Sequence, residues 1–305
     1  MTQLTTAKPS AGVGVVPLPN FLIVGASRSG TTTLHGFLKQ HPDVHFFAGR
    51  QELQFFHRES EYRQGLDAYR RLFCDWQGER AIGDVSPPYF FHGITQDAQG
   101  RHRWDPHDDA PARVAKHLPA AQILITLRNP VERAYSQYWK AVRNGKETAR
   151  TFREAIELEL AGKRNEQNSA LCWIYKNRYS VHLSRWLALF PRERVEFFIF
   201  ERWTKNPAEL MQRICSRLGI DASFQPSYEP KNSGWTPRSR SVAWMTGGWM
   251  GRTSLGRRLR HANRRAGYPR ITAADYRLVA EALSDDRQRL ETLLDEKLDL
   301  WSTPL

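Results

Sequence analysis

The segment from Gly25 to Thr33 combines residue types that can hold a phosphate group. It reads Gly-Ala-Ser-Arg-Ser-Gly-Thr-Thr-Thr, and its two glycines have the spacing of a phosphate-binding loop. Backbone N–H groups of such a loop, and of the helix after it, cradle an anion with the help of the helix dipole. Arg28 adds a fixed charge and a fork of donors. We therefore predict a phosphate ligand here, rather than an ordinary turn rich in glycine and serine.

The residue at position 31 indicates which phosphate chemistry to expect. Thr31 stands where enzymes that use nucleoside triphosphates have a lysine. Such enzymes also need Mg²⁺ and an acidic residue at a strand end, a role that Asp84 could fill. Since the lysine is absent, a phosphate ligand held without a metal fits better. No cluster of His, Cys, Asp and Glu has metal-ligand spacing either.

A second anion site is predicted where the most apolar strand ends. Arg128 follows the run Gln122–Leu127 directly, and open α/β sheets bind their ligands at the carboxyl ends of strands. Pro130 can begin a helix, and Ser136 lies about two turns into it. The alternative interpretation is that Glu132 and Arg133 lie on a solvated helix face, and it suits Glu132 best.

The elements that must position these residues alternate between strands and helices. Apolar runs predict strands at 21–25, 81–84, 122–127 and 195–200. Helical spacing predicts helices at 31–40, 131–144, 175–190, 207–218 and 273–298. We expect an α/β fold, a P-loop-like parallel sheet flanked by helices on both faces. No linker-like stretch divides the chain, so we expect a single domain.

Two motifs together resemble a known family. Residues 19–32 resemble the 5′-phosphosulfate loop of sulfotransferases that use 3′-phosphoadenosine 5′-phosphosulfate (PAPS), and residues 128–138 resemble their 3′-phosphate motif. The similarity continues through residues 51–56, 83–89, 179–183, 186–191 and 200–219. It covers most of residues 19–301 and is closest to the heparan-sulfate-type enzymes of the Golgi and their bacterial relatives. The resemblance implies a PAPS-dependent sulfotransferase that needs no metal.

Carried over residue by residue, the resemblance implies a complete nucleotide site. Arg28 contacts the sulfonate and the 5′-phosphate, a position that is usually lysine in the heparan-type branch and arginine in protein-tyrosine sulfotransferases. The expected ligands of the 5′-phosphate are Ser29, Gly30, Thr31, Thr32 and Thr33. The expected ligands of the 3′-phosphate are Arg128 and Ser136, joined by Arg238 from a late basic loop at residues 231–239.

The transfer itself needs a base, and the resemblance points to Glu52. It matches the glutamate of the family's Lys-Glu…Phe-Phe motif, and a carboxyl group whose pKa is raised beside Phe55 and Phe56 suits a general base. By analogy with phosphoryl transfer, we expect in-line attack through a loose transition state in which Arg28 stabilises the departing phosphate. His57 and His92 are alternative bases, although a packing role suits both better.

Departures from the family fall on the acceptor side. Gln51, Gln54 and Val85 stand where the family usually has lysine, histidine and lysine. Heparan is therefore not implied as the acceptor. We expect a hydroxyl group of a glycan, a lipid or a small metabolite.

The charge of the chain is concentrated late in the sequence. The 305 residues carry a net charge of +13, which predicts an anionic partner. Residues 230–274 contain no Asp or Glu, but hold Lys231, nine arginines and three tryptophans. We predict that residues 231–270 form a basic lid and acceptor-binding surface. Peripheral contact with a membrane stays open, and nucleic acid is disfavoured because no nucleic-acid-binding motif accompanies the charge.

The two ends and the cysteines suggest where the chain works. Residues 1–18 have no signal-peptide pattern and are expected to be a flexible leader before a domain at 19–305. No apolar run has the length of a transmembrane span. Three scattered cysteines argue against a disulfide framework and favour the cytoplasm.

Two other functions remain to be distinguished from a sulfotransferase. A Mg²⁺-dependent P-loop kinase would turn over ATP, and Thr31 argues against it. A basic nucleic-acid-binding protein would bind DNA or RNA with a steep dependence on salt.

Overall fold

The structure, a computed structural model, describes residues 16–49, 51–99, 101–164, 170–229 and 234–302. They form two compact units. Unit 1 comprises the residues up to Leu127 and His182–Glu229, and unit 2 comprises Arg128–Val181 and the residues from Pro230 onward. The chain passes between the units three times, so neither unit is one continuous stretch. Residues 1–15 of the expected leader and 231–233 of the expected lid lie outside the described residues, and that division of the chain stays a prediction.

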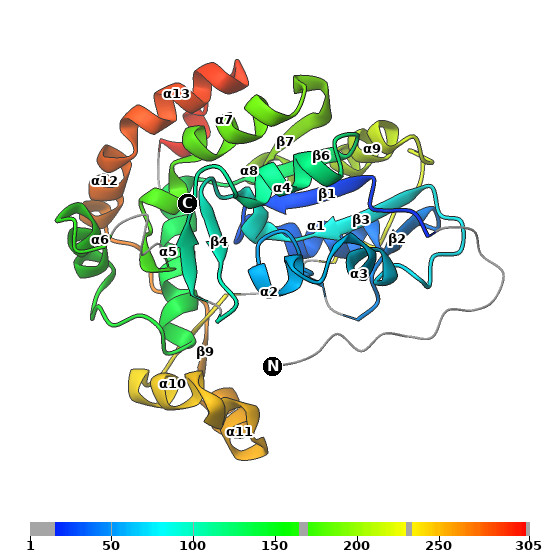
Figure 1. Cartoon of the computed structure of the whole chain (residues 1–305). Coiled ribbons are helices and arrows are strands. Elements are labelled where there is room, and N and C mark those ends of the chain that lie inside the picture. Colours follow the sequence, from blue (N-terminus) through cyan, green and yellow to red (C-terminus); the bar gives the residue numbers. More distant parts are fainter. Residues whose placement is uncertain (1–15, 50, 100, 165–169, 230–233, 303–305) are drawn as a thin grey trace. The chain divides into compact units, whose positions relative to one another are not determined.

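Unit 1 is built on a five-stranded parallel sheet. Its strands are β1 (Phe21–Gly25), β2 (Val44–Phe46), β3 (Ala81–Val85), β6 (Gln122–Leu127) and β7 (Val195–Ile199), in the spatial order β2-β3-β1-β6-β7. The central strand β1 therefore has β3 on one side and β6 on the other (Figure 1). The α/β fold class predicted from the sequence is confirmed, although β2 was not among the predicted strands.

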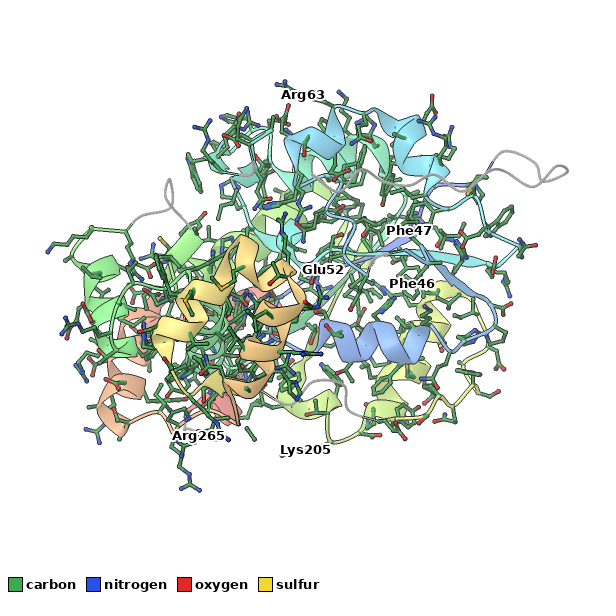
Figure 2. All side chains as sticks on the ribbon, turned by 90° about the horizontal axis from the view of Figure 1, so that it is seen from below. Phe46, Phe47, Glu52, Arg63, Lys205 and Arg265 are labelled. Carbon is green, nitrogen blue, oxygen red and sulfur yellow. The ribbon has the colours of Figure 1, made fainter. Side chains whose placement is uncertain are left out.

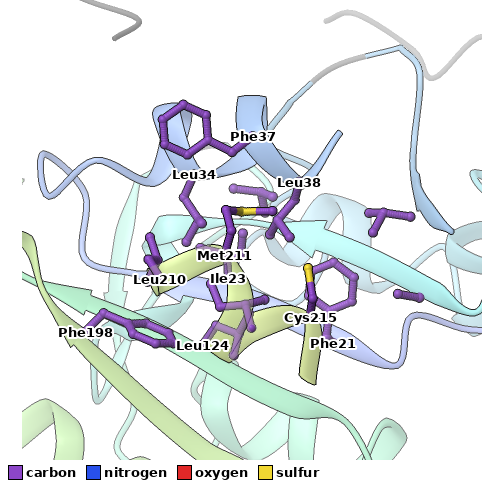
Figure 3. Close-up of a cluster of buried hydrophobic side chains, with 14 of the residues drawn as sticks. Phe21, Ile23, Leu34, Phe37, Leu38, Leu124, Phe198, Leu210, Met211 and Cys215 are labelled. Carbon is purple, nitrogen blue, oxygen red and sulfur yellow. The ribbon is translucent and has the colours of Figure 1, made fainter. Parts of the chain in front are cut away.

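Helices cover the sheet because its central strand, β1, is apolar on both faces. Phe21 and Ile23 of β1 pack beneath α1 (Thr31–Leu38) and α9 (Pro207–Leu218) in one hydrophobic cluster (Figure 3). Leu22 and Val24 alternate to the opposite face and are also fully buried. A strand buried on both faces reads as a continuous apolar run, which is the pattern the sequence shows.

Shorter elements complete unit 1. They are α2 (Glu59–Tyr62), α3 (Leu66–Arg71), the 3₁₀ helices η1 (Pro87–Phe90) and η4 (Arg192–Arg194), β4 (Ile94–Gln96), β5 (His102–Trp104), α4 (Ala110–His117) and α8 (Phe200–Trp203). Helix α7 (Tyr179–Leu189) begins in unit 2 and continues in unit 1.

Unit 2 is mostly helical. Its elements are α5 (Pro130–Arg143), α6 (Phe152–Leu160), η3 (Tyr175–Asn177), β8 (Trp235–Pro237), α10 (Arg240–Gly247), η5 (Trp249–Arg252), α11 (Ser254–Ala262), β9 (Arg264–Ala266), α12 (Ala273–Ala282), α13 (Ser284–Leu294) and η6 (Asp299–Trp301). Its core joins α5 and α6 to α12 around Tyr138, Phe152 and Val279. Strands β8 and β9 pair as a two-stranded antiparallel sheet, with α10, η5 and α11 between them in the sequence.

The prediction of one long final helix at 273–298 is wrong. The chain forms α12 and α13 instead, with a break at Leu283, whose side chain is buried in the core of unit 2. The break places Asp286 where its carboxylate accepts hydrogen bonds from the backbone N–H and the hydroxyl group of Ser180. Tertiary contacts therefore override an uninterrupted helical pattern.

Within the described residues, no helix has the length and apolar character of a membrane span.

Candidate functional site

The turn between β1 and α1 holds an unusual backbone conformation. Arg28 has a φ of 74° and Gly30 a φ of 84°. A positive φ is rare for a residue with a side chain, and such residues gather at ligand-binding sites. A Cβ on Gly30 would lie 2.3 Å from the Trp203 ring and 2.9 Å from that of Phe200, so only glycine fits there. The spacing of glycines in the sequence thus has a steric cause.

Side chains from two other elements fix this turn in place. The Thr126 hydroxyl, from β6, donates a hydrogen bond to the Ser29 carbonyl at 2.8 Å. The indole N–H of Trp203, from α8, donates to the same Thr126 hydroxyl at 2.8 Å. The backbone N–H of Ala26 donates to the Thr126 carbonyl. Sequence reasoning missed Thr126 and Trp203, although a threonine inside an otherwise apolar strand is a signal that could have been used.

The start of α1 has no capping side chain. Gly30 is its N-cap and offers no side-chain acceptor for the N–H groups of the first turn. The Ser29 side chain is fully buried, and its hydroxyl has no hydrogen-bond partner among the described residues. A buried hydroxyl group without a partner is costly, whereas a phosphate oxygen would satisfy it. The loop therefore fits an anionic phosphate ligand.

The segment that carries Glu52 follows β2 and is held by the segment that follows β3. Glu52, Phe46 and Phe47 are labelled in Figure 2. The Glu52 carboxylate accepts a hydrogen bond of 2.8 Å from the Gln54 side chain. The backbone N–H of Gln54 donates to the Ser86 hydroxyl at 2.9 Å. Glu52 is therefore half-buried on a braced loop, at the same edge of the sheet as the turn after β1, since parallel strands end together.

Asp84 organises that bracing. Its carboxylate is 1% exposed and accepts hydrogen bonds from the hydroxyl groups of Ser86, Tyr69 and Tyr89 at 2.7, 2.8 and 2.9 Å. The Tyr89 hydroxyl also accepts the backbone N–H of Phe56. Burial, followed by the nearby Asp84 carboxylate, raises the pKa of Tyr69 and of Tyr89 well above the usual value, so both hydroxyls stay protonated donors. Asp84 thus serves as a structural acceptor, which disfavours the metal-binding role it would have in a kinase.

The histidines near these motifs have structural surroundings. His92 pairs with Asp109 at 3.0 Å, and Asp109 is also paired with Arg185. His57 is buried, 3% exposed. These placements agree with packing roles for both residues.

In unit 2, Arg128 stands at the entrance to α5. Its guanidinium lies 3.7 Å from the Glu132 carboxylate, and its backbone carbonyl accepts a hydrogen bond of 2.8 Å from the Tyr179 hydroxyl. Asn129 caps the helix, because its side-chain oxygen accepts the N–H groups of Val131 and Glu132. The start of α5 is therefore closed by its own chain.

Further along α5, the side chains of Ser136, a predicted site residue, and of the nearby Arg133 are buried. Ser136 is 1% exposed. Arg133, for which a solvated helix face was the alternative interpretation, is fully buried and donates to the Lys176 carbonyl and the Asn177 side chain. Burial lowers the pKa of Lys176 to about 8. The α5 region thus contains internal positive charge that the sequence pattern did not reveal.

Arg238 lies at the end of β8 and is exposed. Its guanidinium Nε donates a hydrogen bond of 3.1 Å to the Arg264 carbonyl on the paired strand β9. The predicted site residues are therefore distributed over both units. Unit 1 holds Glu52 and the loop from Arg28 to Thr33, and unit 2 holds Arg128, Ser136 and Arg238. Their assembly around one nucleotide stays a prediction.

Comparisons with known proteins agree with the loop geometry. Residues 18–233 match the family model described as the sulfotransferase domain. The bifunctional heparan sulfate N-deacetylase/N-sulfotransferase 2 of Homo sapiens is 32% identical over 212 residues, which is 67% of this chain and 22% of that protein. The heparan sulfate glucosamine 3-O-sulfotransferase 5 of Mus musculus is 26% identical over 206 residues, or 68% of this chain and 55% of that protein.

A solved structure extends the similarity over more of the chain. The crystal structure of a sulfotransferase from Alicyclobacillus acidocaldarius is 26% identical, with a TM-score of 0.69. The match covers 94% of this chain and 100% of the other.

Proposed function

Because the chain belongs to the sulfotransferase family, we propose that it transfers the sulfonate group of PAPS to a hydroxyl group. The observation that carries the proposal is the open start of α1, where the Ser29 hydroxyl is buried without a partner beside the positive-φ residues Arg28 and Gly30. Backbone N–H groups and a cation at a helix N-terminus suit an anion such as the 5′-phosphosulfate.

In this proposal the loop binds the part of PAPS at which the bond breaks. Ser29, Gly30, Thr31, Thr32 and Thr33 hold the 5′-phosphate. Arg28 contacts the sulfonate and the phosphate oxygen that leaves. Arg128, Ser136 and Arg238 hold the 3′-phosphate, on the strength of the family motif.

The reaction is an in-line displacement at sulfur. The Glu52 carboxylate removes the proton of the acceptor hydroxyl, whose oxygen forms a bond to sulfur. The bond between sulfur and the 5′-phosphate oxygen breaks, and its electron pair stays on that oxygen, beside Arg28 and the α1 N-terminus. The products are the sulfated acceptor and 3′-phosphoadenosine 5′-phosphate (PAP). No metal enters this proposal.

The acceptor is proposed only as a class. The two curated relatives are named for heparan sulfate, yet Gln51, Gln54 and Val85 replace residues that are usual on the acceptor side of that branch. We propose a hydroxyl group of a glycan, a lipid or a small metabolite. The cytoplasm stays our proposal for the site of action, based on the odd number and wide spacing of the cysteines alone.

Calorimetry with PAP, without added metal, tests the nucleotide site. We expect Arg28→Ala and Arg128→Ala each to weaken PAP binding by about tenfold to a hundredfold, because each removes a charged donor to phosphate. Arg63→Ala is the control in unit 1 and Arg277→Ala the control in unit 2, since both side chains are exposed. Absence of PAP binding by the wild-type chain would reject the proposal, and tight salt-dependent binding of nucleic acid in its place would favour the alternative.

Glu52→Gln tests the base. The glutamine keeps an oxygen that can accept the Gln54 hydrogen bond but cannot take up a proton, so we expect turnover to fall about a hundredfold to ten-thousandfold with PAP binding retained. The control is Glu193→Gln at an exposed position of η4. Full turnover of the Glu52 variant would exclude this residue as the base.

A further inference from the structure

Unit 2 carries a helical hairpin with an unusual surface. We call residues Arg240–Ala262, which form α10, η5 and α11, the basic hairpin. Figure 1 shows α10 and α11 as adjoining helices next to β9. The hairpin lies within the acid-free part of the sequence, and its role is not accounted for by the nucleotide site.

The basic hairpin is firmly attached to unit 2. Arg240 donates hydrogen bonds to the Tyr138 hydroxyl and to the carbonyls of Ala149 and Arg150. A Cβ on Gly145 would lie 2.7 Å from the Trp244 Cα, and one on Gly247 would lie 2.2 Å from a carbonyl oxygen at the end of α5. Backbone therefore packs on backbone at this junction. The surface of α10 is held in one orientation on unit 2.

Helices α10 and α11 also pack closely against each other. Arg260 of α11 donates to the carbonyl of Thr246 in α10. A Cβ on Gly251 or Gly256 would lie 2.1 Å or 1.9 Å from a carbonyl oxygen of the hairpin. These close approaches explain why two glycines occur among so many arginines.

Large apolar side chains project from this fixed framework into solvent. Trp244 is 74% exposed, Met245 42% and Leu255 63%, and they account for three of the four exposed large hydrophobic side chains among the described residues. Trp244 and Met245 lie on the outer face of α10, while Ala243 and Thr246 are buried on its inner face. A folded protein gains nothing by exposing such side chains to water, and clusters of them mark contact sites.

The basic hairpin also carries exposed positive charge. Arg252, Arg257 and Arg258 are exposed and form no ion pair within the described residues. Arg265, on the neighbouring strand β9, is also exposed and extends outward from the ribbon in Figure 2. Residues 230–274 contain no Asp or Glu that could neutralise them.

The combination matches one kind of partner better than the others. A soluble polyanion, such as an acidic glycan, would bind the arginines but would gain little from Met245 and Leu255. An anionic bilayer satisfies both features, because its headgroups attract arginine and its acyl boundary accepts apolar side chains. Tryptophan is also enriched at that boundary.

We propose that the basic hairpin docks this protein on the surface of an anionic lipid bilayer. Trp244, Met245 and Leu255 enter the boundary between headgroups and acyl chains, and Arg252, Arg257 and Arg258 lie among the headgroup phosphates. This inference goes beyond the proposed reaction and does not depend on it, since it rests on exposure and charge in the hairpin alone.

Sedimentation with vesicles tests the proposal on the full chain. We expect binding to vesicles of phosphatidylcholine and phosphatidylglycerol, little binding to phosphatidylcholine alone, and weaker binding as salt rises. Trp244→Ser and Leu255→Ser should each lower partitioning about tenfold, and Arg257→Gln with Arg258→Gln by about the same factor or more. The matched controls are Leu160→Ser, a leucine 51% exposed on α6, and Arg277→Gln with Arg289→Gln. The unfolding temperature of each variant checks that the fold is kept.

A spectroscopic readout separates insertion from simple attraction. Lipids brominated on the acyl chain should quench tryptophan fluorescence in the wild-type chain, whereas Trp244→Phe should keep partitioning and lose most of the quenching. Three results would overturn the proposal. They are equal loss of partitioning in the control variants, retention on heparin that depends on the arginines without any vesicle binding, and a change in oligomeric mass with Trp244→Ser but unchanged partitioning.

Discussion

The turn from β1 to α1 and the turn from β6 to α5 occupy equivalent places after neighbouring strands, yet they treat the start of the helix in opposite ways. Helix α1 begins at Gly30, which has no capping side chain, and the Ser29 hydroxyl beside it is without a partner among the described residues. Helix α5 begins at Asn129, whose side chain accepts two N–H groups of the first turn. The first helix start thus has no side chain of its own cap in the way of an anion, whereas in our proposal the second binds one through side chains such as Arg128.

Gly30→Val is expected to have the largest effect on this comparison. The new side chain would clash with Trp203 and would need a φ that a β-branched residue avoids, so we expect a loss of about 3 kcal/mol in stability. PAP binding should fall below detection in calorimetry. Gly162→Val is the control, because that glycine also has a positive φ but no neighbour within 4 Å. Normal PAP affinity in the Gly30 variant would show that the turn does not hold the ligand.

The next largest effect is on the pH dependence of stability, through the buried amine of Lys176 near α5. The folded-state pKa of Lys176 is about 8, below the ordinary 10.5, because burial disfavours its charged form. Between pH 8 and 10.5 the unfolded chain binds a proton that the folded chain has released. The stability of the wild type relative to Lys176→Met should therefore rise with pH across that window, by roughly 2–3 kcal/mol.

Chemical denaturation at several pH values measures this difference. Lys163→Met, at an exposed position, should show no such rise relative to the wild type. A flat difference for Lys176→Met would mean that this amine is solvated in the folded chain.

Asn129→Ala should cost about 1–2 kcal/mol in stability, because two N–H groups of α5 lose their acceptor and the hydrogen bond to Tyr276 is also lost. Urea denaturation provides the measurement. Asn206→Ala, which removes the equivalent cap of α9, gives a matched value for unit 1. If Asn129→Ala left stability unchanged, the start of α5 would be as open as that of α1.

Ser29→Ala should have the smallest effect, and it should change PAP affinity rather than the stability of the fold. Its hydroxyl has no protein partner among the described residues, so we expect stability to change by less than about 0.5 kcal/mol. PAP affinity should fall about fivefold, because one hydrogen bond to phosphate is lost. A clear loss of stability with unchanged affinity would place the hydroxyl group in the structure rather than in the site.

Local patterns predicted the strands well where the chain is apolar for five residues or more. The bounds of β1 and β6 agree with the prediction, since β1 is buried throughout and β6 is buried from Ile123 to Leu127. Strand β2 was missed because Val44–Phe46 has only three residues and includes a histidine. The break at Leu283 was missed because it depends on packing between elements that are distant in sequence.

The candidate site shows the same limit. The phosphate loop could be predicted because its glycines, its arginine and its flanking elements are contiguous in the sequence. The hydroxyl of Thr126 and the indole of Trp203 act through contacts between residues 77 and 97 positions apart, and no local spacing reports such contacts. The two helix starts also differ in their cap residue, Gly30 or Asn129, but only the structure shows that the Asn129 side chain accepts the N–H groups of its helix.

The three passages of the chain between the units also constrain the order in which the protein can be made. Strand β7 completes the sheet beside β6, but residues 128–194 must be synthesised between the two strands. Until β7 has been synthesised, the edge of β6 that pairs with it has no partner strand. An unpaired strand edge makes the nascent chain prone to associate with other chains. Truncations that end before residue 199 should therefore be insoluble rather than smaller working enzymes. Any attempt to isolate the sheet of unit 1 must join its two segments with a new connection in place of residues 128–181.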